Sequence, residues 1–457
     1  MKACETERIY RRGAEAQRGR REIQKKQRAF LCAVSAPPRL CGRFSWALVA
    51  ATLSALPVAA DATEATAELG WTTRLVGESH ELRHDSPFAV GLPLTGFGRD
   101  RYRIEQELRG RAGPASLLLT VTESGQEGAK PTGRFLANEA YVDFSLGGQR
   151  FSAGKKVLAG DVGYAFRPID VLQRENRMQM MPPQLEGIPM LSWDNFSTDG
   201  AWSLVIANPG HQKRGEVRDD GSVALKVYRR VASADFHGVL RNSTRYGLEA
   251  GAAASWVPDE ALELHASLLL QERGERRLPV ADTAPVATLL AADGALLTEA
   301  IHSPRKALVG GTWTTAEGFS LMGEAWWDGS APAAADWQRL ARQAAQRRAM
   351  LGLPGIPAAA VAGATAASTR MFDQGNLARR GLLARLAWSE PGGGWSLSAD
   401  LLRSLDDGGT TLTAAASWQG DRLRLDAGVR RYGGRADSAY RLLPEAATAF
   451  VGVSLAY

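Results

Sequence analysis

Charged side chains recur at every second position in two segments that lie far apart in the chain. One phase of the first segment holds Arg99, Arg101, Arg103, Glu105, Glu107, Arg109 and Arg111, and one phase of the second holds Arg422, Arg424, Asp426 and Arg430. A β-strand has a period of two residues, so each set shares one face of a strand. Guanidinium groups gathered on one wall favour the passage of anions by charge alone. We therefore expect Arg101, Arg103, Arg422 and Arg424 to line a solute path.

Residue types that could act as a catalyst are present, but their arrangement is poor. Ser79-His80 and His84-Asp85 are pairs of the kind that hydrolases use, yet no nucleophile elbow and no carboxylate that would orient a histidine is visible. The six histidines show no zinc-ligand spacing, and no glycine-rich loop precedes a helix as phosphate binding requires. The sequence therefore predicts neither an enzyme nor a cofactor or metal site.

The opposite phase of the alternating segments is apolar. In residues 262–271, leucine and alanine alternate with Glu263, His265 and Ser267, and similar alternation recurs at 246–256, 307–313, 319–327, 382–388, 395–401, 412–418 and 423–429. Aromatic residues end many of these apolar faces, namely Trp256, Trp313, Trp327, Trp388, Trp395, Trp418 and Tyr457. Trp and Tyr prefer membrane interfaces, which favours a membrane barrel over the alternative of a soluble sheet with a solvated outer face.

Connection lengths predict the number of strands. Residues 61–457 contain no apolar run of about 18 residues, so a membrane-inserted chain must close its strands into a barrel. Eight short connections alternate with nine longer ones, the first of them near 78–98, which predicts 18 strands, with 16 as the fallback. The predicted fold class is all-β, a transmembrane antiparallel β-barrel with long outer loops and short periplasmic turns. Its first and last strands are neighbours, so we expect the two arginine sets to form one ladder across the seam.

Residues 1–60 differ in composition from the rest. They hold 12 Lys/Arg against 4 Asp/Glu and all three cysteines, so 61–457 carries 43 Lys/Arg, 45 Asp/Glu and no cysteine. Arg39 and Arg43, the apolar run 44–56 and the small residues at 57–60 predict a signal peptide over 39–60. Residues 1–38 are interpreted as a disordered lead or an overlong gene start, and a nucleic-acid-binding role of the basic tract 8–28 is disfavoured because the protein would be exported. Residues 61–457 are predicted to form a single barrel.

Two long connections are candidates for function. Connection 159–188 carries Arg167, Asp170, Arg174, Glu175 and Arg177 behind a Gly-rich entry and a Pro-Ile-Asp turn. It either folds into the lumen, where these charges form a constriction, or stays outside, held by local salt bridges. Connection 328–380 contains a helix-forming stretch from 334 to 351 and is either a lid or plug or low-complexity padding.

Two segments carry a family resemblance. Residues 449–457 alternate strictly and end on Tyr457, which resembles the terminal targeting strand of bacterial outer-membrane β-barrels. Residues 149–188, with Gly154-Lys155-Lys156 before a proline-containing loop, resemble large substrate-selective porins, including the alginate-export type. The resemblance implies a cell outer-membrane location, with outer-membrane lipid, lipopolysaccharide and the barrel-assembly machinery as partners, the last through the strand that ends at Tyr457.

The functional expectation is a porin-like channel through which hydrophilic small or oligomeric solutes diffuse, with a mildly anion-favouring lumen. The lumen phase of the predicted strands holds 12 basic and 9 acidic residues, which is the basis for that preference. The alternative is a non-conducting barrel that serves as an anchor or partner in an envelope or secretion complex.

Overall fold

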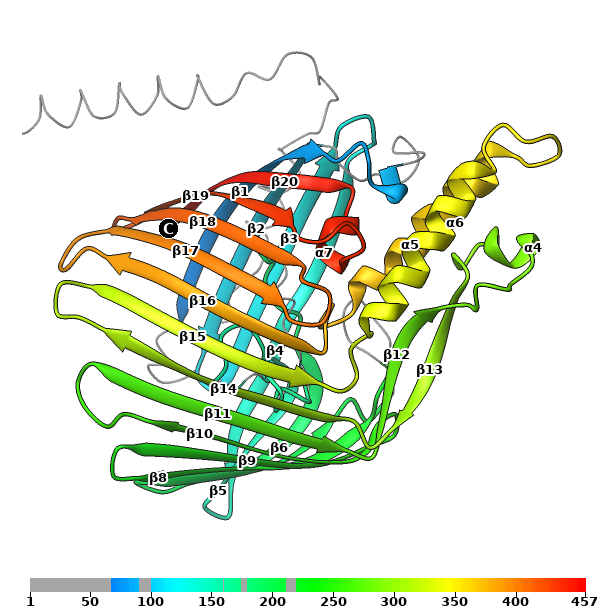
Figure 1. Ribbon diagram of the computed structural model, residues 1–457. Coiled ribbons are helices and arrows are strands. Elements are labelled where there is room, and N and C mark those ends of the chain that lie inside the picture. Colours follow the sequence, from blue (N-terminus) through cyan, green and yellow to red (C-terminus); the bar gives the residue numbers. More distant parts are fainter. Residues whose placement is uncertain (1–66, 90–99, 159, 174–178, 211–218) are drawn as a thin grey trace, which may run out of the picture. The chain divides into compact units, whose positions relative to one another are not determined.

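A computed structural model describes residues 67–89, 100–158, 160–173, 179–210 and 219–457, all within one compact unit, Ala65–Tyr457. The predicted lead and signal peptide lie outside the described residues. Within the unit, strands form a closed antiparallel barrel (Figure 1). Helices are confined to the connections between strands. No helix in these ranges combines the length and the apolar character needed to cross a membrane.

The barrel has 18 strands, as the connection lengths predict. They are β1 (Glu68–Leu82), β2 (Arg101–Ala112), β3 (Ala115–Gln126), β4 (Thr132–Leu146), β5 (Gln149–Lys156), β6 (Ile188–Phe196), β7 (Gly200–Ala207), β8 (Ser222–Val231), β9 (Ala234–Ser243), β10 (Gly247–Trp256), β11 (Leu262–Gln271), β14 (Arg305–Thr314), β15 (Phe319–Asp328), β16 (Arg380–Ser389), β17 (Trp395–Ser404), β18 (Thr410–Gln419), β19 (Leu423–Gly433) and β20 (Glu445–Ala456). Each pairs with its neighbour in the chain, β11 pairs with β14, and β20 closes the barrel on β1. The predicted fold class is confirmed.

The period of two separates an apolar outer face from a polar inner one. On β11, Leu264, Leu268 and Leu270 are exposed, whereas His265 and Ser267 between them are buried. The same pattern leaves leucine, valine and aromatic side chains exposed around the outside of the barrel. A contiguous apolar belt of this extent is unfavourable in water and matches the lipid-facing surface of a membrane barrel.

Aromatic side chains mark the rim where the short turns lie. Trp395 lies directly opposite Trp418 in the register of β17 and β18, and Phe319 packs near Trp388 with ring centroids 6.4 Å apart. On the other side of the barrel, a row of aromatic rings crosses β4, β5, β6 and β7 beside two short turns, formed by Phe144, Phe151, Trp193 and Trp202. This rim is the aromatic girdle expected at one membrane interface.

The long connections at the other rim carry the remaining elements. These are η1 (Pro87–Ala89), the hairpin β12 (Arg273–Pro279) and β13 (Leu296–His302), α4 (Val286–Leu289), α5 (Ala334–Ala349), α6 (Ala358–Ser368), η2 (Thr369–Asp373) and α7 (Ala439–Leu442). Of these, η1, α5, η2 and α7 share an apolar core in which Phe88, Trp337, Leu340, Met371 and Tyr440 are buried. We call this assembly the cap; α5, α6 and the hairpin extend beyond the barrel at that end (Figure 1). Connection 328–380 therefore has a packed structure, and its interpretation as padding is wrong.

Substitution of Val309 tests which face of the barrel contacts lipid. It is 61% exposed on the outer face of β14, between Trp313 near one rim and Trp327 near the other. Val309→Arg is expected to make folding into lipid vesicles less favourable by about 2–4 kcal/mol, because it places a charge at mid-depth in the apolar belt. Thr312→Arg, three residues along the same strand on the lumen side, is the matched control and should change that free energy little. Equal effects of the two substitutions would contradict the assignment of faces.

Candidate solute path

The described residues of the connection between β5 and β6, namely 157–158, 160–173 and 179–187, fold into the lumen. The backbone N–H groups of Tyr164 and Ala165 donate to the two carboxylate oxygens of Glu324, at 2.6 and 2.7 Å. Glu324 is a buried, lumen-facing residue of β15, on a part of the wall distant from β5 and β6. Arg385 of β16 donates to the Tyr164 hydroxyl at 2.8 Å. Of the two alternatives for this connection, the lumen placement is therefore correct.

The first lobe of this connection, residues 160–173, is stabilised by its own aspartates. Asp161 accepts hydrogen bonds from the N–H groups of Val162 and Ile169, both at 2.7 Å, and from the Ser267 hydroxyl at 3.3 Å. Asp170 accepts one from the Gly160 N–H at 2.8 Å. These carboxylates satisfy amide groups that a loop packed inside a barrel cannot expose to water.

An apolar patch on the lumen wall receives the first lobe. Ile169 and Val171 pack in one buried cluster with wall residues Val239, Ala253 and Leu269. A second cluster, made by Leu308, Trp326 and Leu383, packs against Tyr164, Ala165 and Phe166. Burial of apolar side chains in these two clusters holds the lobe against the wall formed by β9–β11 and β14–β16.

Burial of the two aspartates makes the first lobe sensitive to pH. Desolvation raises the pKa of Asp161 and of Asp170 above the ordinary value for aspartate. The folded lobe therefore binds protons more tightly than the unfolded chain does. Their contribution to stability is most favourable below the pKa of an unfolded aspartate, about 3.9, and it declines as the pH rises through the raised values.

The second lobe, residues 179–187, crosses to the seam between the first and last strands. Its root is fixed to β4 and β5: Glu186 pairs with Lys155 at 2.6 Å and with Arg134 at 3.1 Å. The Asn138 side-chain amide donates to the carbonyls of Gln184 and Leu185. These contacts hold residues 184–187 in one place.

Gln173 ties the two ends of the connection together. Its side-chain carbonyl accepts from the Leu158 N–H at 2.8 Å, and its side-chain amide donates to the Glu186 carbonyl at 2.9 Å. A single buried side chain therefore joins the entry into the first lobe to the exit from the second.

The tip of the second lobe, Met181 and Pro182, rests on the seam. Arg103 of β2 donates to the Met181 carbonyl at 2.6 Å, and Arg74 of β1 donates to the Pro182 carbonyl at 3.4 Å. The methyl group of Met181 lies against Gly452 of β20, where a Cβ atom would come within 2.6 Å of it. The tip thus touches three adjacent strands of the wall.

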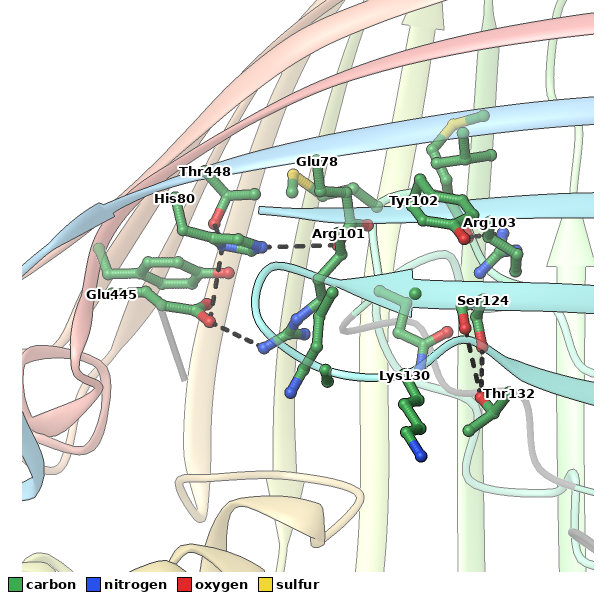
Figure 2. Close-up of a pocket in the computed structure, with 18 residues that line it drawn as sticks. Glu78, His80, Arg101, Tyr102, Arg103, Ser124, Lys130, Thr132, Glu445 and Thr448 are labelled. Carbon is green, nitrogen blue, oxygen red and sulfur yellow. Dashed lines mark hydrogen bonds and ion pairs between the residues drawn. The ribbon is translucent and has the colours of Figure 1, made fainter. Parts of the chain in front are cut away.

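Two hollows lie along the seam, and the tip borders both. The outer hollow, of about 590 Å³, lies toward the long connections, and the inner hollow, of about 740 Å³, lies toward the short turns. Met180 and Met181 line both of them. Charged residues of the outer hollow, all labelled in Figure 2, are Glu78, Arg101, Arg103, Lys130 and Glu445. Those of the inner hollow are Arg74, Glu139, Arg422, Arg424 and Asp426.

The arginines expected to form one ladder are divided between the hollows. Arg101 and Arg103 line the outer hollow, whereas Arg422 and Arg424 line the inner one. The reason is the tip of the second lobe, which lies on the wall between them. Most of these guanidinium groups have acidic partners: Arg101 pairs with Glu445 at 3.3 Å, Arg103 with Glu105 at 3.3 Å and Arg424 with Asp426 at 2.9 Å. The ladder is therefore a set of alternating charges.

Arg167 and Asp170 of connection 159–188 have a different placement from the one expected. Arg167 donates to the Gly163 carbonyl at 2.8 Å and lies 3.6 Å from Asp170, so both serve the first lobe itself. Neither lines the outer or the inner hollow. The other three predicted constriction residues, Arg174, Glu175 and Arg177, lie outside the described residues.

Sequence reasoning missed the contributions of β1 and of the tip. It ended the first strand near residue 78, but β1 continues to Leu82 and so places Glu78 and His80 in the outer hollow. The ring of His80 contacts the Thr448 hydroxyl at 3.0 Å and Glu445 at 3.5 Å (Figure 2). Ser79 faces the opposite side of the strand, which removes the Ser79-His80 pair as a catalytic unit. Arg74, Glu78 and His80 share one phase of the strand, and this pattern was the sequence signal that β1 continues beyond residue 78.

Removal of the Glu324 carboxylate is expected to release the first lobe. Glu324→Ala leaves the Tyr164 and Ala165 amides without their charged acceptor, so their hydrogen–deuterium exchange should accelerate by about tenfold or more, since hydrogen bonds to charged groups contribute about 1.5–3 kcal/mol. Glu324 also contacts the ring of His265, at 3.0 Å from its Nε2 atom. Glu263→Gln is the matched control, because Glu263 contacts the Nδ1 atom of that ring but has no hydrogen bond to the described residues of the lobe. Unchanged exchange at residues 164 and 165 in Glu324→Ala would contradict the conclusion that the Glu324 carboxylate holds the first lobe.

Comparison with solved structures shows a similarity of fold. Neither protein-family models nor curated protein sequences match the chain. Among solved structures, OccAB1 of Acinetobacter baumannii is 9% identical with a TM-score of 0.50, over 86% of this chain and 96% of that one. OccK11 of Pseudomonas aeruginosa is 9% identical with a TM-score of 0.47, over 85% and 95%. A mutant of the Rhodopseudomonas blastica porin is 11% identical with a TM-score of 0.39, over 86% and 100%. At such identities only the fold is shared, and the expected porin-like β-barrel is confirmed at that level.

Proposed function

We propose that the chain is an outer-membrane channel through which hydrophilic solutes diffuse along the seam. The observation that carries the proposal is the pair of hollows, which are lined by charged side chains and are both bordered by Met180 and Met181. They run along the inside of a closed barrel whose outer face is apolar, so a polar route lies inside a wall suited to lipid. Solute selection in such a route depends on side-chain charge at its narrow parts.

The charge balance along the route supports a mild preference for anionic solutes, small or oligomeric. Each hollow is lined by three arginine or lysine side chains and two carboxylates. Arg422 of the inner hollow forms no ion pair within the part of the chain that the structure describes, which leaves its charge available to a solute. A lumen with excess positive charge raises the local concentration of anions.

The C-terminal strand supports insertion into the outer membrane. Tyr457 is 67% exposed at the short-turn rim, and its N–H donates to the Trp71 carbonyl of β1 at 2.9 Å. The strand before it closes the barrel, and its aromatic end is accessible to the barrel-assembly machinery. In this proposal, outer-membrane lipid and lipopolysaccharide contact the apolar belt.

A second candidate is a non-conducting barrel that anchors a partner in an envelope complex. The observation that favours it is the tight packing of the first lobe, where Ile169 and Leu269 are buried together inside the barrel. The packed cap at the long-connection end also offers a folded surface outside the barrel. Conductance separates this candidate from the channel.

The decisive experiment is single-channel recording of the protein purified from the outer membranes of a Gram-negative expression host. Steady unitary conductance with a reversal potential that indicates anion preference is expected. The double substitution Arg422→Gln/Arg424→Gln should lower the anion-to-cation permeability ratio by about twofold or more, because it removes two cations from the inner hollow. A folded, heat-modifiable barrel without conductance would contradict the channel function and favour the non-conducting barrel that anchors a partner.

The matched control is Arg348→Gln, which removes a positive charge from α5 of the cap. Arg348 lines neither hollow, so the permeability ratio should stay near that of the unsubstituted protein. A ratio that changes equally in both variants would place the selective charge outside the seam.

A further inference from the structure

The second lobe is held unequally along its length. At its root, residues 184–187 have a buried acidic side chain paired with two cations and two carbonyls bonded to Asn138. At its tip, the Met181 carbonyl has one donor from Arg103, and the Pro182 carbonyl has one from Arg74 at the long distance of 3.4 Å. The root is therefore a fixed end, and the tip is the part that local changes can displace.

The wall of β20 has a seat that matches the tip. A side chain at position 452 would collide with Met181, since a Cβ atom there would lie 2.6 Å from the Met181 methyl carbon. Gly452 provides the space, and Met181 fills it without a polar contact. Because Met180 and Met181 line both hollows, the seated tip lies at the junction between them.

In the bonds that hold the tip, a charged guanidinium group donates to a neutral backbone carbonyl. A carboxylate or phosphate attracts a guanidinium by charge as well as by hydrogen bonding and can accept two of its N–H groups at once, whereas a backbone carbonyl is neutral. Arg103 lies 3.3 Å from Glu105 and uses another N–H group for the Met181 carbonyl. It also lines the outer hollow, so an oxyanion that arrives there meets the same group that holds Met181.

We propose that Arg74 and Arg103 are positioning residues that hold the tip of the second lobe across the junction of the hollows, and that a small oxyanion opens the junction by taking the guanidinium of Arg103 from the Met181 carbonyl. This inference rests on the proposed channel function. It assigns the narrow point of the route to the tip, and it makes Gly452 the seat on which the tip closes.

Cross-linking the tip to its seat tests this mechanism. The full chain carries Met181→Cys and Gly452→Cys, with its native Cys4, Cys32 and Cys41 replaced by serine. Removal of the Met181 side chain leaves room at 452, where the next contact of a Cβ atom is 3.5 Å from Asp426. A short bifunctional thiosulfonate should reduce the unitary conductance at least threefold, and a reductant should restore it. The single variant Met181→Cys, treated in the same way, is the control and should keep its conductance.

A substitution that leaves the seat intact gives a second test. In the unsubstituted protein, millimolar sulfate is expected to increase the fraction of time spent in the higher of two conductance levels by about twofold or more. Arg103→Gln should occupy the higher level without sulfate and show no response to it. Arg109→Gln removes the same charge from the same strand outside both hollows and should respond as the unsubstituted protein does.

The outcomes separate this mechanism from the channel function itself. A conducting protein whose conductance is unchanged by a cross-link verified by mass spectrometry would overturn the mechanism and leave the channel in place. A sulfate response that persists in Arg103→Gln would do the same. Absence of conductance in the unsubstituted protein would overturn both.

Discussion

Closure of the hydrogen-bonded sheet is the constraint on which the rest of the structure depends. A backbone N–H or C=O without a partner is costly in lipid, so every strand of the barrel has to be paired on both sides. The last pair is made by β1 and β20, which brings the two ends of the barrel sequence side by side (Figure 1). Arg74, Arg103 and Arg424 come from opposite ends of the barrel sequence and reach one wall because of this closure.

The local parts of this structure could be predicted from the sequence, because they depend on neighbouring residues. Alternation identified the lipid and lumen faces, and all eight short turns lie where glycine, proline and polar residues interrupt it. The end of β1 was misplaced because a strand that continues beyond the apolar belt keeps its pairing but loses its apolar signal. Glu78 and His80 continue the lumen phase of β1 in that stretch, and their partners on β20 are distant in sequence.

The course of the two lobes could not be predicted, because it is determined by contacts between residues far apart in the chain. Tyr164 and Glu324, for example, are separated by 160 positions. One signal was nevertheless present: Leu269, Leu308 and Leu383 occupy lumen-phase positions that charged or small residues hold elsewhere. Apolar side chains at such positions indicate that something packs on them from inside. The charges of the first lobe were identified correctly as unusual, but their function is to satisfy buried amides.

The position of the two lobes has a consequence for biogenesis. They lie in the connection between β5 and β6, whereas the wall that receives the first lobe includes β14–β16, which are synthesised much later. The seat of the second lobe on β20 is synthesised last of all. Neither lobe can dock before strands near the C-terminus are in place, and contacts of such long sequence separation form slowly. The lobes can therefore narrow the lumen only after the wall strands that receive them are in place.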